Sequence, residues 1–238
     1  LAVQPSLLKL MSTLEGVDTL LTQGDALPIF DFHIPVMSLP LAFKTFSVVD
    51  IPSSDAYLFA TQDSIAIWQA RLGSKIKPRV GLVWNGGLIE HLPEQWLVNT
   101  RRNVTFASIA KLNRSDIDFY SLQKGEPAES ELLRSKEQYW SSSNLHIYSQ
   151  DLRDFNDTAG LISQLDLVIS VDTSVAHLAA AMGKPVWLLN RFDTDWRWLL
   201  GRDDSPWYPT LRQFRQKQDG DWEDTIARVT LALDQAFN

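Results

Sequence analysis

Short apolar runs alternate with amphipathic stretches along most of the chain, which is the pattern of a parallel α/β fold. After residue 78 the apolar runs predict strands, and the stretches between them have helical spacing. The predicted strands cover 80–84, 117–125, 145–150, 166–171 and 185–189, and the predicted helices cover 105–113, 129–140, 157–165, 174–182 and 221–236. Between the first strand and about residue 103 the polar composition predicts a long loop.

Three of these helices have predicted ends or faces. Asp157 is expected to be the N-cap of the helix 157–165. Gly183, with Pro185 behind it, is expected to end the helix 174–182. The apolar side of the closing helix 221–236 is predicted to consist of Ile226, Val229, Leu231 and Leu233.

The first part of the chain has a weaker pattern. Residues 6–14 predict a helix, 17–23 a strand, 30–36 a short strand or extended loop, and 63–73 a helix that ends at Gly73. Two or three strands are too few to form a stable sheet alone. We therefore predict that 1–75 is part of an N-terminal Rossmann-like domain and that 76–238 is a complete C-terminal one. Because the chain opens with Leu1, we expect it to be a fragment or a processed product.

Composition narrows the functional classes. The 238 residues carry a net charge of −7, which disfavours a nucleic-acid partner. The chain has no cysteine, which fits a cytoplasmic protein, and it lacks both a signal peptide and an apolar run long enough to span a membrane. An acidic protein of this kind can still bind a small phosphate ligand through local amides and one or two cations.

The segment "SVDTSVAHLAAAMGKPVWLLN", 170–190, contains the most informative turn. Its apolar strand ends at Asp172, and the next helix begins near Ser174, where free N–H groups and the helix dipole favour an anion. Ser174 and His177 are three residues apart, so both are expected on one side of the first turn. Two other interpretations stay open, since Asp172 could be a plain N-cap and His177 a half-buried structural residue.

The motif "DLVISVDTSVAHLAAAMGKPVWLL" resembles the signature of the family 9 glycosyltransferases, the ADP-heptose:lipopolysaccharide heptosyltransferase type. The stretches "RVGLVWNGG", "RRNVTFASIAKL" and "SPWYPTLRQFRQ" are similar to the transferase-like domain found at the C-terminus of bacterial tetratricopeptide-repeat proteins. The resemblance implies a GT-B fold, in which two Rossmann-like domains face each other. It also implies a nucleoside diphosphate sugar as donor, bound mainly by the C-terminal domain, with no metal and no cofactor.

The resemblance implies donor contacts at particular positions of this chain. Arg102 takes the place of a phosphate-facing lysine, Asn85 and Gly86 match the phosphate-side loop, and 154–158 would line the base pocket. The positions implied to bind the donor are Asp172, Thr173, Ser174, His177, Arg102, Asn85, Gly86, Gln123 and Lys124. A solvated loop arginine is the alternative interpretation of Arg102.

Two features depart from the family pattern. The glycine-rich loop that carries the proposed acceptor-activating acid is missing from 1–75, where Asp31 and His33 are the titratable pair worth naming. The segment "TDWRWLLGRDDSPWYP" is unlike heptosyltransferases, and its Trp196 and Trp198 are expected to be structural, with a wall of a sugar pocket as the alternative. The catalytic residues therefore stay unknown, and we expect this chain by itself to turn over poorly.

Three functions remain open. The first is the donor-binding portion of a glycosyltransferase that acts on an unknown acceptor, which could be a glycan, a lipid-linked molecule or a protein. The second is a catalytically degenerate binding or scaffolding module fused to repeats. The third is a sugar-nucleotide epimerase, which would need more acidic and histidine side chains around the sugar than this chain offers.

Overall fold

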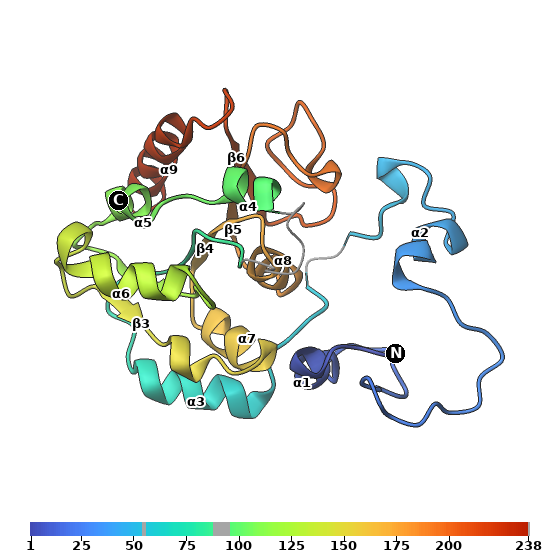
Figure 1. Ribbon diagram of the computed structural model, residues 1–238. Coiled ribbons are helices and arrows are strands. Elements are labelled where there is room, and N and C mark those ends of the chain that lie inside the picture. The colour runs from blue at the N-terminus through green and yellow to red at the C-terminus, as the bar shows by residue number, and fades with distance from the viewer. Residues whose placement is uncertain (54–55, 88–95, 238) are drawn as a thin grey trace.

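The computed structural model describes residues 1–53, 56–87 and 96–237. Its centre is a parallel sheet of six strands in the order β3-β2-β1-β4-β5-β6 (Figure 1). The strands are β1 (Arg79–Val83), β2 (Asp118–Ser121), β3 (Leu145–Ile147), β4 (Leu167–Val171), β5 (Val186–Asn190) and β6 (Leu211–Arg215). This is the strand order of a doubly wound Rossmann sheet.

Helices cover both faces of this sheet. The helices after residue 60 are α3 (Gln62–Leu72), α4 (Trp96–Arg102), α5 (Phe106–Ile109), α6 (Ala128–Tyr139), α7 (Phe155–Ser163), α8 (Ser174–Ala181) and α9 (Trp222–Ala236). Short 3-10 turns lie at 110–112, 149–151 and 196–198. Because both faces are covered, β1 and β4 are buried along their whole length.

Two apolar clusters lie on the two faces of the sheet. One joins α3, α7 and α8 and includes Trp68 and Leu161. The other joins α5, α6 and α9 and includes Phe106, Leu132 and Val229. The alanines of α8 are also buried, so this helix lies close to the sheet. The tight packing fixes where the loops after the strands emerge.

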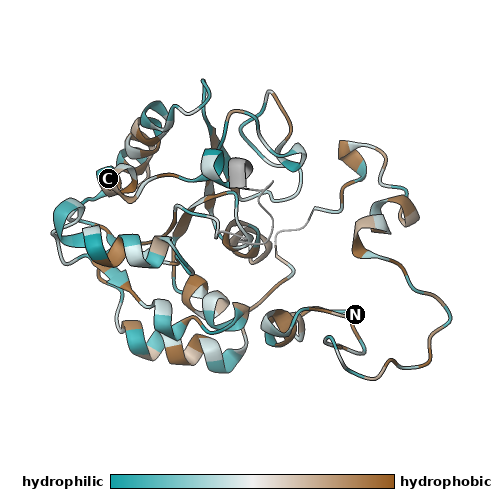
Figure 2. Ribbon diagram, in the orientation of Figure 1, coloured by the Kyte–Doolittle hydropathy of each residue, from teal (hydrophilic) through white to brown (hydrophobic). Residues whose placement is uncertain are grey.

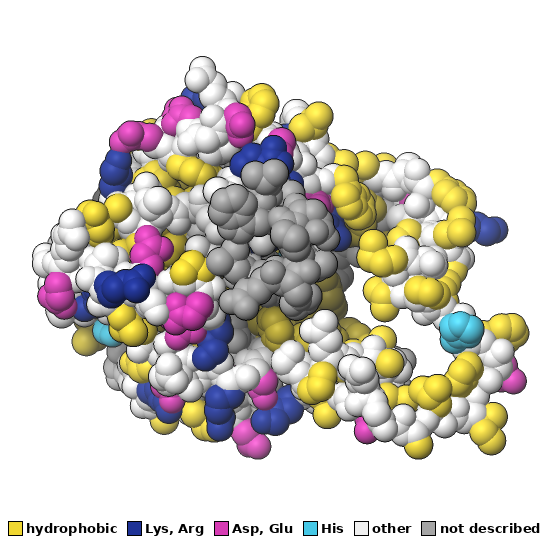
Figure 3. All heavy atoms as spheres, in the orientation of Figure 1, with side chains coloured by type: hydrophobic (Ala, Val, Ile, Leu, Met, Phe, Trp, Pro, Cys, Tyr) yellow, Lys and Arg dark blue, Asp and Glu magenta, His cyan; other side chains and the backbone are white. Residues whose placement is uncertain are grey.

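Residues 1–53 contain short helices and turns: 5–7, α1 (Leu8–Met11), 36–38, α2 (Leu39–Ala42) and 48–50. Many apolar side chains between 27 and 49 are exposed, and Figures 2 and 3 show them as brown and yellow along the arm that carries α2. In the described part of the chain no helix is both long enough and apolar enough to cross a bilayer. The domain boundary near residue 75 stays a prediction.

The structure confirms most of the predicted elements and corrects several. The predicted strand 17–23 is wrong: among the described residues it contributes an isolated bridge between Leu21 and Ala2, because no neighbouring strand lies beside it. The segment 30–36 contains no strand: it has a bend at Asp31, and Val36 begins a 3-10 turn. The predicted long loop before residue 103 contains the helix α4. Gly73 ends α3 at a positive φ of 62°, as predicted.

The structure also corrects the predicted start of α7 and the predicted apolar side of α9. Asp154, not Asp157, is the N-cap of α7, and its carboxylate accepts from the Asp157 N–H at 2.8 Å. Leu231 of α9 is 59% exposed, because it lies two residues from both Val229 and Leu233 and therefore on the opposite side of the helix. The edge strand β6 was missed, since "LRQFR" is short and contains only two apolar residues.

The close contact between α3 and α7 generates a stability prediction. A Cβ on Gly160 would lie 2.1 Å from Ser64 Oγ and 2.5 Å from Trp68 Cδ1, and Trp68 is fully buried. Gly160→Ala should therefore lower the free energy of unfolding by about 1–3 kcal/mol in urea titrations. Gly87→Ala is the control, because a Cβ there meets no atom within 4 Å. An increase in stability, the usual result of Gly→Ala inside a helix, would contradict this packing.

Candidate donor site at the carboxyl edge of the sheet

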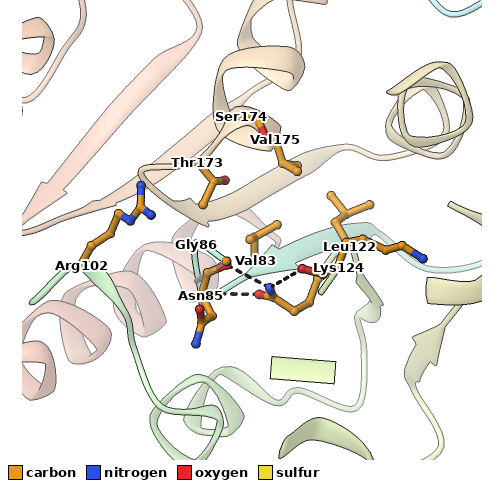
Figure 4. A pocket seen from close by; sticks show the side chains of 11 residues that line it. Val83, Asn85, Gly86, Arg102, Leu122, Lys124, Thr173, Ser174 and Val175 are labelled. Atoms are coloured by element: carbon orange, nitrogen blue, oxygen red, sulfur yellow. Dashed lines mark hydrogen bonds between the residues drawn. The ribbon is translucent and has the colours of Figure 1, made fainter. Parts of the chain in front are cut away.

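The strand order reverses between β1 and β4, which are neighbours in the sheet. In open α/β sheets the crevice outside the carboxyl ends at such a point is the usual ligand site. A pocket of about 210 Å³, here called the central pocket, lies there (Figure 4). It is lined by Val83, Asn85, Gly86, Gly87, Arg102, Leu122, Gln123, Lys124, Thr173, Ser174 and Val175.

The turn after β4 presents the start of α8 to the central pocket. Thr173 has extended backbone angles (φ −141°, ψ 166°), and its side chain makes no capping hydrogen bond to α8. Its hydroxyl lies 3.0 Å from Ser170 Oγ instead. The first N–H groups of a helix have no acceptor within the helix. At Ser174 they are therefore available to an anion, and the helix dipole adds to the attraction.

Arg102 supplies the positive side chain of the central pocket. Its Nη1 donates to the Asp172 backbone carbonyl at 2.8 Å, and its Nη2 donates to Asn99 Oδ1. Its Nε is buried and has no hydrogen-bond partner among the described residues. Burial lowers the pKa of this guanidinium; the Asp172 carboxylate opposes that effect, and the charge of Arg191 adds to it. An incoming anion would relieve this buried positive charge.

Gly86 makes room for the guanidinium. A Cβ at this position would lie 2.3 Å from Arg102 Nη2 and 2.5 Å from Cζ. The space that the missing side chain leaves is occupied by the arginine. The Gly86 N–H donates to Asn103 Oδ1 at 2.9 Å, which fixes the loop after β1.

Gln123 joins the end of β2 to the loop after β1. Its Oε1 accepts from the Trp84 and Asn85 N–H groups at 3.2 and 3.0 Å, and its Nε2 donates to the Asn85 carbonyl at 2.9 Å (Figure 4). The side chain is 2% exposed and fully engaged, so its visible role is to hold this loop. Asn85 Oδ1, in contrast, is buried without a partner among the described residues.

Lys124 and His177 lie apart from Arg102. Figure 4 shows the Lys124 side chain directed away from Arg102, and its Nζ donates to the Ser149 carbonyl at 2.6 Å. His177 is not among the residues that line the central pocket. Its Nδ1 lies 2.9 Å from the Tyr208 hydroxyl, its Nε2 lies 3.6 Å from Asp172 Oδ1, and its ring stacks on Trp198.

The Asp172 side chain also points away from the central pocket, toward His177, although its carbonyl anchors Arg102. Burial raises the pKa of this carboxyl, but the neighbouring His177, Trp198 and Arg102 side chains outweigh burial and lower it. Asp172 is therefore ionised at neutral pH and supports the turn. It acts through its neighbours and does not line the central pocket.

A second pocket of about 170 Å³, here called the side pocket, adjoins the first. It shares Leu122, Lys124, Ser174 and Val175 with the central pocket. Its other lining residues include Asp154, Phe155 and Thr158, from the segment 154–158 that was expected to line a base pocket.

Sequence reasoning overlooked two residues near the central pocket. Asn99 lies one turn before Arg102 on α4, and it was missed because this helix was predicted as a loop. Arg191 directly follows β5, has a side chain 13% exposed, and its Nη1 is buried without a partner among the described residues. Its position at the carboxyl end of a strand was the available signal.

Other candidates lie elsewhere. Arg101 pairs with Asp193 at 2.7 Å and is absent from the lining of the central pocket. Asp31 and His33 are exposed on the arm that carries α2. Among residues 1–53, 56–87 and 96–237, no group of three or more His, Cys, Asp or Glu side chains is arranged to ligate a metal ion.

A sequence profile described as glycosyltransferase family 9 (heptosyltransferase) matches residues 153–190. The matched segment contains α7, β4, the turn at Asp172, α8 and β5. The predicted resemblance to the family 9 glycosyltransferases is confirmed.

Individual relatives extend this likeness. Protein FlbA of Caulobacter vibrioides is 30% identical over 192 residues, which cover 76% of this chain and 29% of FlbA. The family 9 glycosyl transferase of Veillonella parvula aligns with a TM-score of 0.53 at 12% identity, over 77% of this chain and 54% of that one. The E. coli ADP-heptose LPS heptosyltransferase II aligns with a TM-score of 0.49 at 15% identity, over 79% and 55%. The chain thus spans under a third of FlbA and about half of each solved structure, and the Veillonella structure shows the fold alone.

The family 9 resemblance implies that Gln123 contacts the donor, whereas its hydrogen bonds to the loop after β1 indicate a structural role. A substitution at this position tests the structural role. Gln123→Ala would leave the Trp84 and Asn85 N–H groups without their acceptor, so the free energy of unfolding should fall by about 1–3 kcal/mol. Gln138→Ala, on the exposed side of α6, is the matched control. Unchanged thermal and urea unfolding of Gln123→Ala would contradict the structural role.

Proposed function

We propose that this chain is the donor-binding portion of a metal-independent glycosyltransferase that uses a nucleoside diphosphate sugar. The central pocket carries this proposal, because a helix start meets a buried guanidinium there, and the Nε of that guanidinium has no partner within the described ranges. The family 9 resemblance supports the same class of donor. An attachment to tetratricopeptide repeats stays part of the proposal.

The two adjoining pockets suggest how such a donor is placed. The diphosphate would occupy the central pocket, beside Ser174 and Arg102. The nucleoside would occupy the side pocket, against Phe155 and Thr158. Lys124 borders both pockets, while its ammonium group donates to the Ser149 carbonyl.

The proposed reaction would use Arg102 and the N–H groups at Ser174 to stabilise the leaving diphosphate. When the acceptor oxygen attacks the anomeric carbon, the bond to the diphosphate breaks and negative charge grows on the phosphate oxygens. Arg102 and the N–H groups at Ser174 are already oriented toward that position, and preorganised groups of this kind lower the barrier. Arg102 keeps its proton throughout, so it stabilises charge without transferring a proton.

A group that activates the acceptor would distinguish a glycosyltransferase from a module that only binds the donor. None of the described residues that line the central pocket is an aspartate, glutamate or histidine, so none of them can act as a general base. This observation favours, as the second candidate, a module that binds a nucleotide sugar without transferring it. Acceptor-dependent release of free nucleoside diphosphate by this chain would rule out that second candidate.

Arg102 and Arg101 provide a matched pair for testing the donor site. Arg102→Ala should weaken binding of a nucleoside diphosphate about ten- to hundredfold, because one charge-assisted hydrogen bond contributes roughly 1.5–3 kcal/mol. Arg101→Ala should have little effect, since that side chain is paired with Asp193. Titration calorimetry with ADP, UDP and GDP measures both. Equal, negligible losses would place the ligand away from this loop.

The proposal also predicts how binding responds to chelation. The affinity for the diphosphate should be the same with and without EDTA, because side chains and amides supply the positive charge. Calorimetric titrations of one protein preparation, with EDTA or with added Mg²⁺, make the comparison. A tenfold or larger loss of affinity in EDTA would show that a metal takes part.

A further inference from the structure

A third pocket meets the other two at Ser174. It measures about 320 Å³ and is here called the apolar pocket. It is lined by Gln4, Leu7, Leu10, Met11, Tyr57, Leu58, Phe155, Ser174, His177, Leu178, Ala181 and Tyr208. Ser174 therefore borders all three pockets, and Phe155 borders both the side pocket and the apolar pocket.

The position of the apolar pocket matches the third part of the proposed donor. A nucleoside diphosphate sugar consists of a nucleoside, a diphosphate and a sugar, and the sugar is bonded directly to the diphosphate. If the diphosphate lies at the start of α8, the sugar must lie within one bond of it. The apolar pocket runs from Ser174 along one face of α8, past His177 and Leu178 to Ala181, so it begins where the diphosphate ends.

The walls of the apolar pocket are fixed by packing. The segment at Tyr57 and Leu58 is attached to the end of α8, because both N–H groups donate to the Ala181 carbonyl, at 2.9 and 3.2 Å. On the facing wall Leu10 is 1% exposed. Figure 1 shows α1 lying beside α7, and its Leu10 and Met11 line the pocket.

Two polar side chains of the apolar pocket, His177 and Tyr208, are engaged with each other, and Gln4, Tyr57 and Ser174 also line it. His177 Nδ1 lies 2.9 Å from the Tyr208 hydroxyl, and Nε2 faces Asp172 at 3.6 Å. Burial and the neighbouring Tyr57 raise the pKa of the Tyr208 hydroxyl, so it stays protonated. The Ser174 hydroxyl lies at the mouth, where the pocket joins the central pocket.

This lining discriminates among sugars. A fully hydroxylated sugar would bring several hydroxyl groups against leucine, methionine and phenylalanine side chains, where each would lose water without gaining a partner. A buried hydroxyl left unpaired in this way typically weakens binding about five- to hundredfold. A methyl or acetyl group in the same place would instead be stabilised by contact with those side chains.

We infer that the apolar pocket binds the transferred sugar and that this sugar is a deoxy or N-acylated one rather than a fully hydroxylated one. The inference rests on the proposed function, because the diphosphate fixes where the sugar begins. It names a substrate class that differs from hydroxyl-rich sugars such as heptoses.

The test compares sugars that differ in one group. Saturation-transfer NMR on this chain would use L-fucose against L-galactose, and N-acetylglucosamine against glucose. The 6-methyl protons of L-fucose and the acetyl protons of N-acetylglucosamine should receive the strongest saturation. L-fucose should bind at least fivefold more tightly than L-galactose, and N-acetylglucosamine at least fivefold more tightly than glucose. Equal binding, tighter binding of the hydroxylated partner, or no binding of any of the four sugars would overturn the inference.

Substitutions in the apolar pocket test whether the sugar preference arises there. Met11→Gln and Leu7→Gln each place a polar group in the apolar pocket at a partly buried position and should abolish the preference. Leu133→Gln, 69% exposed on α6, should retain it. A preference that survives both pocket variants, in protein whose thermal unfolding is unchanged, would contradict the assignment.

A parallel titration with ADP, UDP and GDP separates the two proposals. Diphosphate binding without a sugar preference would overturn the sugar assignment and leave the donor site standing. Absence of diphosphate binding would overturn both.

Discussion

The hydrogen bond from Arg102 to the Asp172 carbonyl connects the parts of the candidate site. It joins the end of α4 to the end of β4, and it passes over Gly86 at the end of β1. A side chain at position 86 would occupy the place of the guanidinium. The two strand ends that flank the switch point are thus held at a fixed separation by a cation, and the space between them is the central pocket.

This arrangement explains how an acidic chain can offer an anion site. The net charge is −7, yet the carboxylate of Asp172, in the turn after β4, is turned toward His177. The Asp172 carbonyl anchors Arg102, and Arg102 and the start of α8 line the central pocket. Local orientation of dipoles and one buried charge therefore decide the character of the site, while the overall charge affects solubility and partner choice.

Sequence reasoning predicted the sheet well where burial is complete. Strands covered on both faces are continuous apolar runs, so β1, β4 and β5 were recognisable without any knowledge of their neighbours. The predicted strand 17–23 was wrong because strand formation depends on a partner, which a local pattern does not reveal. The N-cap of α7 was misplaced by one turn because both Asp154 and Asp157 have suitable side chains, and the backbone angles decide between them.

The lining of the site was predicted only in part, because local sequence patterns do not reveal contacts with distant residues. The family resemblance suggested Arg102 and the turn after β4 suggested Ser174, and both residues line one pocket in the structure. That this pocket binds a donor stays a prediction. Spacing did not show that Gln123 is engaged by backbone groups or that the ring of His177 faces Tyr208. Such details depend on side-chain orientation and on contacts between residues more than thirty positions apart.

The central claim is that the pocket between β1 and β4 binds a diphosphate. A crystal structure of this chain with inorganic pyrophosphate tests it independently of the nucleotide and the sugar. The account predicts pyrophosphate oxygens within hydrogen-bonding distance of the Ser174 N–H and of the Arg102 guanidinium. Pyrophosphate bound at another surface, with the central pocket filled by water alone, would contradict it.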